Sequence, residues 1–404
     1  MPVYLFATLD TKGHEAAFVR DQLKALGVEI VVVDTGCTGV PAIEADIPRE
    51  QVFAAADTTL AEMLSRGDRG MAVTAAAKGA ARLASQWHAA GSVTGVLGIG
   101  GSAGSTIGTA AMRALPLGVP KLMVSTLASG QVRQYVGDKD ILMLNSVVDI
   151  LGVNRVSRLV LGNAAKAMAG MVSLRLASAA GQDKPLIAAS MFGVTTLCVS
   201  HAREILEQAG FEVLVFHATG NGGQAMESLI ADGLVAGVLD ITTTELADEL
   251  VGGVLSAGPD RLTAAARAGV PQVVSVGALD MVNFHAPETI PAKFAERKLY
   301  HHNATVTLMR TKPEENAALG AEIGRKISAS RGPAAVMLPL QGVSAIDAAG
   351  QPFDDPTARS ALFDGVRKNL QGVELLEIDR HINDPEFAAA AAQKLLKLMA
   401  SVAK

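Results

Sequence analysis

The chain has 404 residues, of which 49% are hydrophobic, 19% are charged and 4% are aromatic. This composition suffices for a large buried core, and the length predicts two domains. The net charge of −5 at pH 7, without a basic tract, argues against nucleic acid or an anionic membrane surface as a partner. The scarcity of aromatic side chains also argues against a platform that stacks on bases.

Three further features predict a cytoplasmic protein. The first ten residues, MPVYLFATLD, are typical of a β-strand and lack the basic start of a signal peptide. The apolar runs are short and interrupted by glycine, which indicates buried parallel strands and no membrane span. The two cysteines, Cys37 and Cys198, lack the spacing of a metal site, so we expect both to stay reduced.

Short apolar strands alternate with helices through the first half of the chain. Apolar, strand-like runs are expected at 3–7, 29–34, 93–99, 119–125 and 140–148. Helices are expected at 14–26, 58–66, 71–90, 105–115 and 151–180, with a polar turn at 8–13 and irregular chain at 47–53. Alternation at this spacing predicts an α/β fold with a doubly wound parallel sheet. The long stretch 151–180 is interpreted as the connector that leaves the first lobe.

The second half begins with the same pattern as the first. When the chain from Pro2 is aligned with the chain from Pro185, the matched positions are Lys12 with Thr195, Gly27 with Gly210 and, after one inserted residue, Gly36 with Gly220. This internal repeat predicts two similar lobes, 1–180 and 181–404. In the second lobe, strands are expected at 237–241, 272–276, 305–309, 334–339 and 372–378, helices at 224–231, 261–268 and 384–402, and a less regular insertion at 281–300.

A glycine-rich loop follows the strand at 93–99. The sequence GIGGSAGST at 98–106 runs from this strand into a helix, the layout that presents free backbone N–H groups to an anion. We therefore predict that Gly100, Gly101, Ser102 and Gly104 hold a phosphate. The alternative is a tight turn whose glycines serve packing. NAD is disfavoured because the next strand ends at Ser125 without the acidic residue that would hold its ribose. A P-loop is also disfavoured, because no lysine follows the last glycine of the loop.

Polar residues follow the other strands of the first lobe, where ligands of parallel sheets bind. They are Asp10, Thr11 and Lys12 after the first strand, Thr35 and Gly36 after the second, and Ser125 after the fourth. Lys12 is suited to neutralise phosphate charge, and Asp10 to hold Mg²⁺ or a ribose hydroxyl. The alternative is that the DTKG segment forms a turn and caps a helix.

The second lobe offers titratable groups at its own strand ends. His217, Asp240 and His301 are the candidate catalytic residues, since imidazoles and carboxylates can move protons near neutral pH. A hydrogen-bonded structural role for His217 and a surface position for His301 are the alternatives. Consecutive histidines, as at 301–302, cannot both face one metal from a strand, so no metal ligand is assigned.

Seven motifs together resemble one known family. They are ATLDTKG at 7–13, VDTG at 33–36, GIGGSAGST at 98–106, QYVGDKDILMLNSVVDILGVNRVSRLVLGNAA at 134–165, HATGNGGQAMESLI at 217–230, DITTTELADELVGG at 240–253 and LPLQGVSAID at 338–347. The chain resembles the ATP-binding domain family named after a plant protein that confers resistance to tomato mosaic virus. The resemblance implies two Rossmann-like lobes, ATP in the N-terminal lobe, a homo-oligomer, and a separate TIM-barrel protein as a partner.

The resemblance also implies which residues contact the nucleotide: Asp10, Thr11, Lys12, Thr35, Gly36, Gly100, Gly101, Ser102 and Gly104. The first functional hypothesis is a cytoplasmic protein that binds ATP, with Mg²⁺, and transfers a phosphoryl or acyl group to a small polar acid. The second is a non-catalytic, ATP-responsive sensor or scaffold that binds a protein partner. The third is a metal-dependent hydrolase that uses His217, Asp240 and His301.

Overall fold

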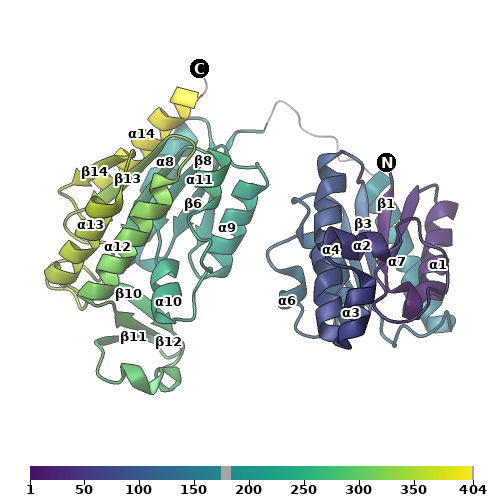
Figure 1. Cartoon of the computed structure of the whole chain (residues 1–404). Helices are drawn as coiled ribbons and strands as arrows, with labels where there is room; N and C mark the ends of the chain where they lie inside the picture. The colour runs from purple at the N-terminus through teal and green to yellow at the C-terminus, as the bar shows by residue number, and fades with distance from the viewer. Residues whose placement is uncertain (174–182, 403–404) are drawn as a thin grey trace. The chain divides into compact units, whose positions relative to one another are not determined.

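The computed structural model describes residues 1–173 and 183–402. The chain divides into two compact units, Met1–Ala180 and Gly181–Lys404, here called lobe one and lobe two. Each lobe has its own parallel sheet, with helices on both faces (Figure 1). The predicted α/β fold with two Rossmann-like lobes is confirmed.

Lobe one is built on a five-stranded parallel sheet in the order β2-β1-β3-β4-β5. Its strands are β1 (Val3–Ala7), β2 (Ile30–Asp34), β3 (Gly95–Gly100), β4 (Lys121–Ser125) and β5 (Leu142–Asn145). Its helices are α1 (Leu9–Ala25), α2 (Arg49–Ala55), α3 (Leu60–Arg66), α4 (Arg69–Ala89), α5 (Ser102–Arg113), α6 (Arg133–Val136) and α7 (Arg155–Ser173). Successive side chains of a strand face opposite sides, so Leu5 packs with α1 and α7 while Tyr4 packs with α4 and α5.

Three local predictions for lobe one were wrong. The expected polar turn at 8–13 is largely helical, because the backbone N–H of Leu9 donates to Asp34 Oδ1 at 3.1 Å and α1 starts there. The helix departs from helical angles at Lys12 (φ −129°, ψ 20°). The expected irregular chain at 47–53 contains the start of α2, which follows Pro48. Of the predicted helix 151–180, α7 begins at Arg155, and residues 174–180 lie outside the described residues.

Lobe two is built on a six-stranded parallel sheet in the order β14-β13-β9-β8-β6-β7. Its strands are β6 (Leu186–Met191), β7 (Glu212–His217), β8 (Gly237–Thr242), β9 (Gln272–Gly277), β13 (Ala334–Pro339) and β14 (Glu374–Ile378). Its α-helices are α8 (Thr196–Gln208), α9 (Asn221–Ala231), α10 (Glu245–Val251), α11 (Ala264–Ala268), α12 (Pro313–Ser328), α13 (Pro356–Asn369) and α14 (Pro385–Val402). Helices α8 and α14 pack on one face of the sheet, and α9 to α13 on the other.

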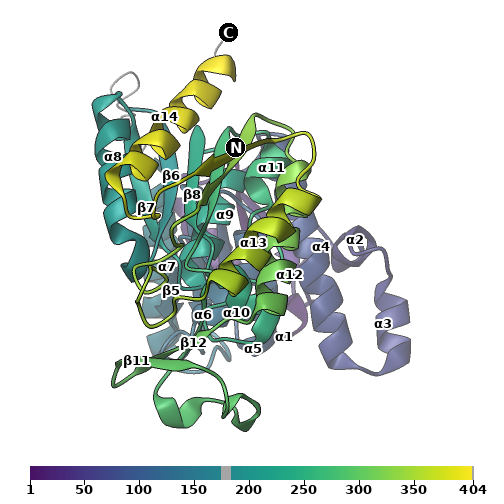
Figure 2. The same cartoon turned by 90° about the vertical axis from the view of Figure 1, so that its left-hand side faces the viewer.

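The segment predicted as an irregular insertion is part of a second, antiparallel sheet. Its strands are β10 (Met281–Phe284), β12 (Val306–Arg310) and β11 (Leu299–Asn303), in that order. Short 3₁₀ turns lie at Gly193–Thr195, Pro287–Thr289 and Ala292–Phe294. The small sheet projects from one end of lobe two in both views (Figures 1 and 2). Helices α12 and α13 were not among the predicted elements, although they pack closely on each other.

The two lobes share one topology. In each, the first βαβ unit pairs its two strands in parallel, β1 with β2 and β6 with β7. The third strand then lies on the other side of the first, so the strand order reverses between β1 and β3 and between β6 and β8. Ligands of open parallel sheets bind at such a point, outside the carboxyl ends of the strands. None of the helices within the described ranges is long and apolar enough to cross a membrane.

Candidate functional site

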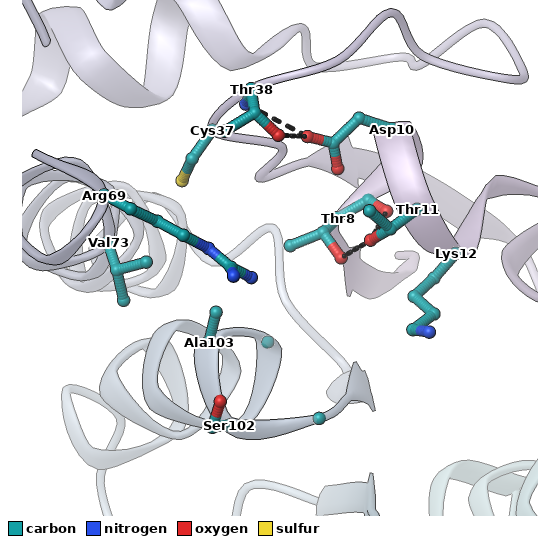
Figure 3. Close-up of a pocket in the computed structure, with 12 residues that line it drawn as sticks. Thr8, Asp10, Thr11, Lys12, Cys37, Thr38, Arg69, Val73, Ser102 and Ala103 are labelled. Carbon is teal, nitrogen blue, oxygen red and sulfur yellow. Dashed lines mark hydrogen bonds between the residues drawn. The ribbon is translucent and has the colours of Figure 1, made fainter. Parts of the chain in front are cut away.

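A cavity of about 190 Å³ opens where the strand order of lobe one reverses, between the loops that follow β1 and β3. The residues that line it come from the ends of these loops and the first turns of α1 and α5, from the segment after β2 and from the start of α4 (Figure 3). They are Thr8, Asp10, Thr11, Lys12, Cys37, Thr38, Arg69, Val73, Gly101, Ser102, Ala103 and Gly104. The position is therefore the one that the topology assigns to a ligand.

The N-terminus of α5 forms one wall of the cavity, and no acidic side chain of the described residues accepts hydrogen bonds from it. Gly101 is the N-cap residue and supplies no side-chain cap. The backbone N–H groups of Ser102, Ala103 and Gly104 donate no hydrogen bond within the described part of the chain. Free N–H groups at a helix N-terminus carry partial positive charge, so this wall attracts an anion.

Arg69 supplies a positive charge opposite α5. It is the first residue of α4, and its guanidinium extends between Thr8 and Ala103 (Figure 3). The side chain forms neither a hydrogen bond nor an ion pair with any described residue, unlike Arg82 on the same helix, which pairs with Asp57 at 2.6 Å. An unpaired guanidinium beside free N–H groups is suited to bind phosphate or carboxylate oxygens.

Asp10 adds a carboxylate whose two oxygens differ in the hydrogen bonds that they accept. Oδ2 accepts from the backbone N–H and hydroxyl of Thr38, each at 3.0 Å, and from the backbone N–H of Gly39 at 3.1 Å. Burial acts to raise the pKa of Asp10, but these hydrogen bonds outweigh it and hold the pKa below its usual value. Oδ1 is buried and has no hydrogen-bond partner among the residues that the structure describes. Asp10 is therefore ionised and has a free oxygen for a cation or a hydroxyl.

Lys12 lines the cavity, but its ammonium has a partner elsewhere. Lys12 Nζ donates a hydrogen bond to the backbone oxygen of Ile150, in the loop between β5 and α7. Beside it, the hydroxyls of Thr8 and Thr11 lie 2.8 Å apart. Among the described residues that line the cavity, Arg69 is thus the cation without a hydrogen-bond or ion-pair partner.

The other predicted residues of lobe one lie behind the cavity wall. Thr35 is buried and its N–H donates to Ala7, while the N–H of Gly36 donates to Asp34 Oδ1 at 2.8 Å. A Cβ on Gly36 would lie 2.9 Å from Asp10 Cγ, and one on Gly100 would lie 2.6 Å from the Cα of Gly104. Ser125 Oγ lies 2.6 Å from Ser105 Oγ. These residues support the cavity, whereas Asp10, Thr11, Lys12, Gly101, Ser102 and Gly104 line it.

Sequence reasoning missed half of the lining. Arg69 was not predicted because nothing in the neighbouring sequence distinguishes it from Lys78 and Arg82 on the same helix. Its side chain faces the glycine loop only because α4 packs against α5. Cys37 lines the cavity too, but burial raises the pKa of its thiol to about 11, which leaves it protonated near neutral pH. The other missed residues lie within two positions of a predicted residue or, for Val73, one helical turn after Arg69. They are Thr8, Thr38, Val73 and Ala103.

In lobe two a different helix start is filled by the chain itself, because α9 follows β7, the counterpart of β2, whereas α5 follows β3. The buried carboxylate of Glu245 accepts from the N–H groups of Gly220, at 2.7 Å, and Gly223, at 3.0 Å, at the start of α9. The buried guanidinium of Arg261 donates to the same carboxylate at 2.7 Å. An anion position formed by a glycine loop, a helix start and an arginine is therefore present, but Glu245 occupies it.

The three candidate catalytic residues of lobe two lie on three different elements. His217 ends the edge strand β7, is exposed and contacts the ring of Phe192. Asp240 is buried in β8, where both its oxygens accept from Arg261, at 2.5 and 2.7 Å. His301 is exposed on β11 of the small sheet. Within the residues that the structure describes, no group of three or more His, Cys, Asp or Glu side chains could hold a metal ion.

Comparison with known proteins places both lobes in one family. Residues 1–177 match the N-terminal domain, and residues 184–399 the C-terminal domain, of the uncharacterised protein family UPF0261. The chain belongs to this family. A "UPF0261 protein" of Clostridium tetani is 48% identical over 399 residues, covering 98% of each chain.

The family extends to plants. The "ToMV resistance protein Tm-1(GCR237)" of Solanum lycopersicum is 40% identical over 418 residues, covering 98% of this chain and 55% of the tomato protein. The resemblance seen in the sequence motifs is thus confirmed at the level of the family, while ATP binding stays a prediction. Among solved structures, a glycosyltransferase of Streptomyces sp. SF2575 aligns over 99% of this chain and 96% of its own, at 14% identity, but its TM-score of 0.22 carries no argument about function.

Proposed function

We propose that lobe one binds ATP, with the phosphates against the N-terminus of α5. The observation that carries the proposal is the pairing of three free N–H groups, at Ser102 to Gly104, with the unpaired guanidinium of Arg69 across one cavity. The resemblance to the ATP-binding family supplies the nucleotide as the source of the phosphate.

The size of the cavity indicates which part of the nucleotide it would enclose. A volume of about 190 Å³ is below the ~300–1,000 Å³ of pockets that bury a drug-sized ligand. We therefore expect the cavity to surround the phosphates, with the ribose and base outside it. The free Oδ1 of Asp10 fits a Mg²⁺ ion that accompanies the phosphates, since carboxylate oxygens are preferred Mg²⁺ ligands.

Each lining group then has a definable role. The α5 N–H groups and Arg69 bind phosphate oxygens and hold the phosphates in one orientation. Asp10 holds the cation, whose charge would offset that of the phosphates. The hydroxyl pair of Thr8 and Thr11 can donate to a further oxygen. No histidine is among the described residues of the wall. We therefore propose nucleotide binding, while transfer of a group to a small polar acid stays a prediction.

A charge placed at the start of α5 tests the proposal. Ala103 lines the cavity in the first turn of α5, where a side chain can be added without entering the core. Ala103→Asp puts a carboxylate where the phosphates would lie, and like charges in contact cost several kcal/mol. Ala103→Asn has nearly the same shape without the charge and is the matched control.

Calorimetric titration of the full chain with Mg-ATP gives the readout, with NAD and inorganic triphosphate as comparison ligands. We expect Mg-ATP to bind, Ala103→Asp to weaken binding about a hundredfold, and Ala103→Asn to change it less than about threefold. NAD should give no heat of binding. No binding of Mg-ATP, or equal binding by the two variants, would refute the proposal. Equal affinity for triphosphate and Mg-ATP would show that the site recognises polyphosphate without the nucleoside.

A further inference from the structure

Lys12 connects the candidate phosphate site to a surface loop. Its ammonium donates to the backbone oxygen of Ile150, in the loop of residues 146–154 between β5 and α7 (the β5–α7 loop). One helical turn further along α1, the buried carboxylate of Glu15 accepts from the N–H of Gly152 at 2.5 Å. The loop is therefore tethered to α1 at two points, and one of the two tethers is a residue that lines the cavity.

The β5–α7 loop holds a strained residue and exposes apolar side chains. Val147 has φ +66°, which is unfavourable for a β-branched residue. Its N–H donates to Asn145 Oδ1 at 3.2 Å, and the N–H of Val148 donates to the oxygen of Ser146 at 2.7 Å. Val147 and Leu151 are 70% and 75% exposed. The loop is held by its tethers and by Ile150, whose side chain is buried in the core of lobe one, while the strained Val147 and the exposed Leu151 lie outside that core.

The two partners available to Lys12 differ in charge. Ile150 offers a neutral carbonyl oxygen, whereas a phosphate offers anionic oxygens, which attract an ammonium more strongly because both partners are charged. In Figure 3 the Lys12 side chain extends away from Asp10 and Arg69, so its ammonium must swing to reach a ligand held between Arg69 and α5. The contact with the ligand and the contact with Ile150 are therefore alternatives.

We propose that an anionic ligand in the cavity draws Lys12 away from Ile150 and thereby loosens the β5–α7 loop. The proposal rests on the proposed function, since it assigns a consequence to occupancy of that site. The mobility of the exposed apolar residues Val147 and Leu151 then depends on whether the cavity is filled. Ligand binding inside lobe one thus changes the surface of the lobe. The device needs no movement of the sheet, because Glu15 keeps the end of the loop in place.

Hydrogen exchange of the full chain tests the proposal, with and without saturating Mg-ATP. We expect the amides of Val148 and Leu151 to exchange about tenfold faster in the bound state, as for the loss of one tethering hydrogen bond, while the amide of Gly152, which donates to Glu15, stays protected. Lys12→Met removes the donor, so its loop should exchange at the faster rate without any ligand. Lys12→Arg keeps a donor and should exchange like the natural chain. Lys24→Met, which removes an exposed lysine of α1, is the matched control and should leave the loop unchanged.

The outcomes separate this inference from the proposed function. If calorimetry shows that Mg-ATP binds while the loop exchanges equally or more slowly in the bound state, the inference is wrong and the binding site stands. If the loop of free Lys12→Met exchanges like that of the natural chain, Ile150 is not a functional tether and the inference is again wrong. If neither Mg-ATP nor inorganic phosphate binds, the proposed function fails and the inference falls with it.

Discussion

Removal of the Arg69 guanidinium is the sharpest single test of the electrostatics of the cavity. Arg69→Ala deletes the cation that faces the open N-terminus of α5 and breaks no ion pair within the described structure. The side chain is exposed and lies at the first position of α4, whose cap is formed by Asp68. We therefore expect the variant to fold with unchanged stability, so a loss of binding would report on the site alone.

The expected size of the effect follows from the exposure of Arg69. Hydrogen bonds to charged groups contribute about 1.5–3 kcal/mol, and solvent screening at an exposed side chain favours the lower half of that range. A loss of about 1.5–2 kcal/mol weakens binding roughly 10- to 30-fold. Arg69→Lys should recover part of the loss, because it restores the charge without the planar pair of donors.

Calorimetric titration with Mg-ATP at ~0.15 M salt measures this effect, since the Debye length there is about 8 Å and distant charges contribute little. Arg82→Ala is the matched control: it removes an arginine from the same helix whose guanidinium pairs with Asp57 outside the cavity. We expect Arg82→Ala to bind like the natural chain. The reasoning would be refuted if Arg69→Ala retained full affinity, or if both variants lost affinity equally.

Two further predictions concern stability, at Gly223 and Asp280 in lobe two, with Gly162 in α7 of lobe one as the comparison. A Cβ on Gly223 would lie 2.2 Å from Glu245 Oε2, so Gly223→Ala should lower the free energy of unfolding by about 2–4 kcal/mol. A Cβ on Gly162 would have no heavy atom within 4 Å, so Gly162→Ala should raise the free energy of unfolding by up to about 1 kcal/mol. Urea titration of both variants measures the two changes. Equal effects would contradict the packing argument. Burial raises the pKa of Asp280 from 3.8 to about 7, so the folded chain keeps a proton that the unfolded chain releases, and stability falls as pH rises from about 4 to 7. Asp280→Asn should lose less stability than the natural chain between pH 5 and pH 8 in thermal unfolding, and an unchanged pH dependence would contradict the assignment.

Much of lobe one could be predicted from local pattern. Buried parallel strands have continuous apolar sequences, and β1, β2, β3 and β4 each lie within two residues of the expected ends. One boundary that failed depended on a distant group. Helix α1 starts at Leu9 because Asp34, at the end of another strand, accepts from its N–H. No pattern around residues 8–13 contains that acceptor.

The small sheet of lobe two shows the same limit. Its strands β10 and β11 are short, and His301 to Asn303 are polar and exposed, so the segment lacks the alternation that marks a strand. They form strands because both pair with β12. Pairing partners of this kind are a property of the folded lobe.

The sequence by itself determined the doubly wound α/β fold, the repeat, and the glycine loop with Asp10 to Lys12 at the ends of neighbouring strands. These features depend on hydrophobic periodicity and on glycine, whose effects reach only a few residues along the chain. The tertiary structure alone decided which charges meet there. Packing of α4 against α5 brings Arg69 to an unfilled helix start in lobe one, while in lobe two the fold brings Glu245 and Arg261 to the start of α9. An open helix start and a filled one can thus share a local pattern, because the group that fills the second comes from elsewhere in the chain.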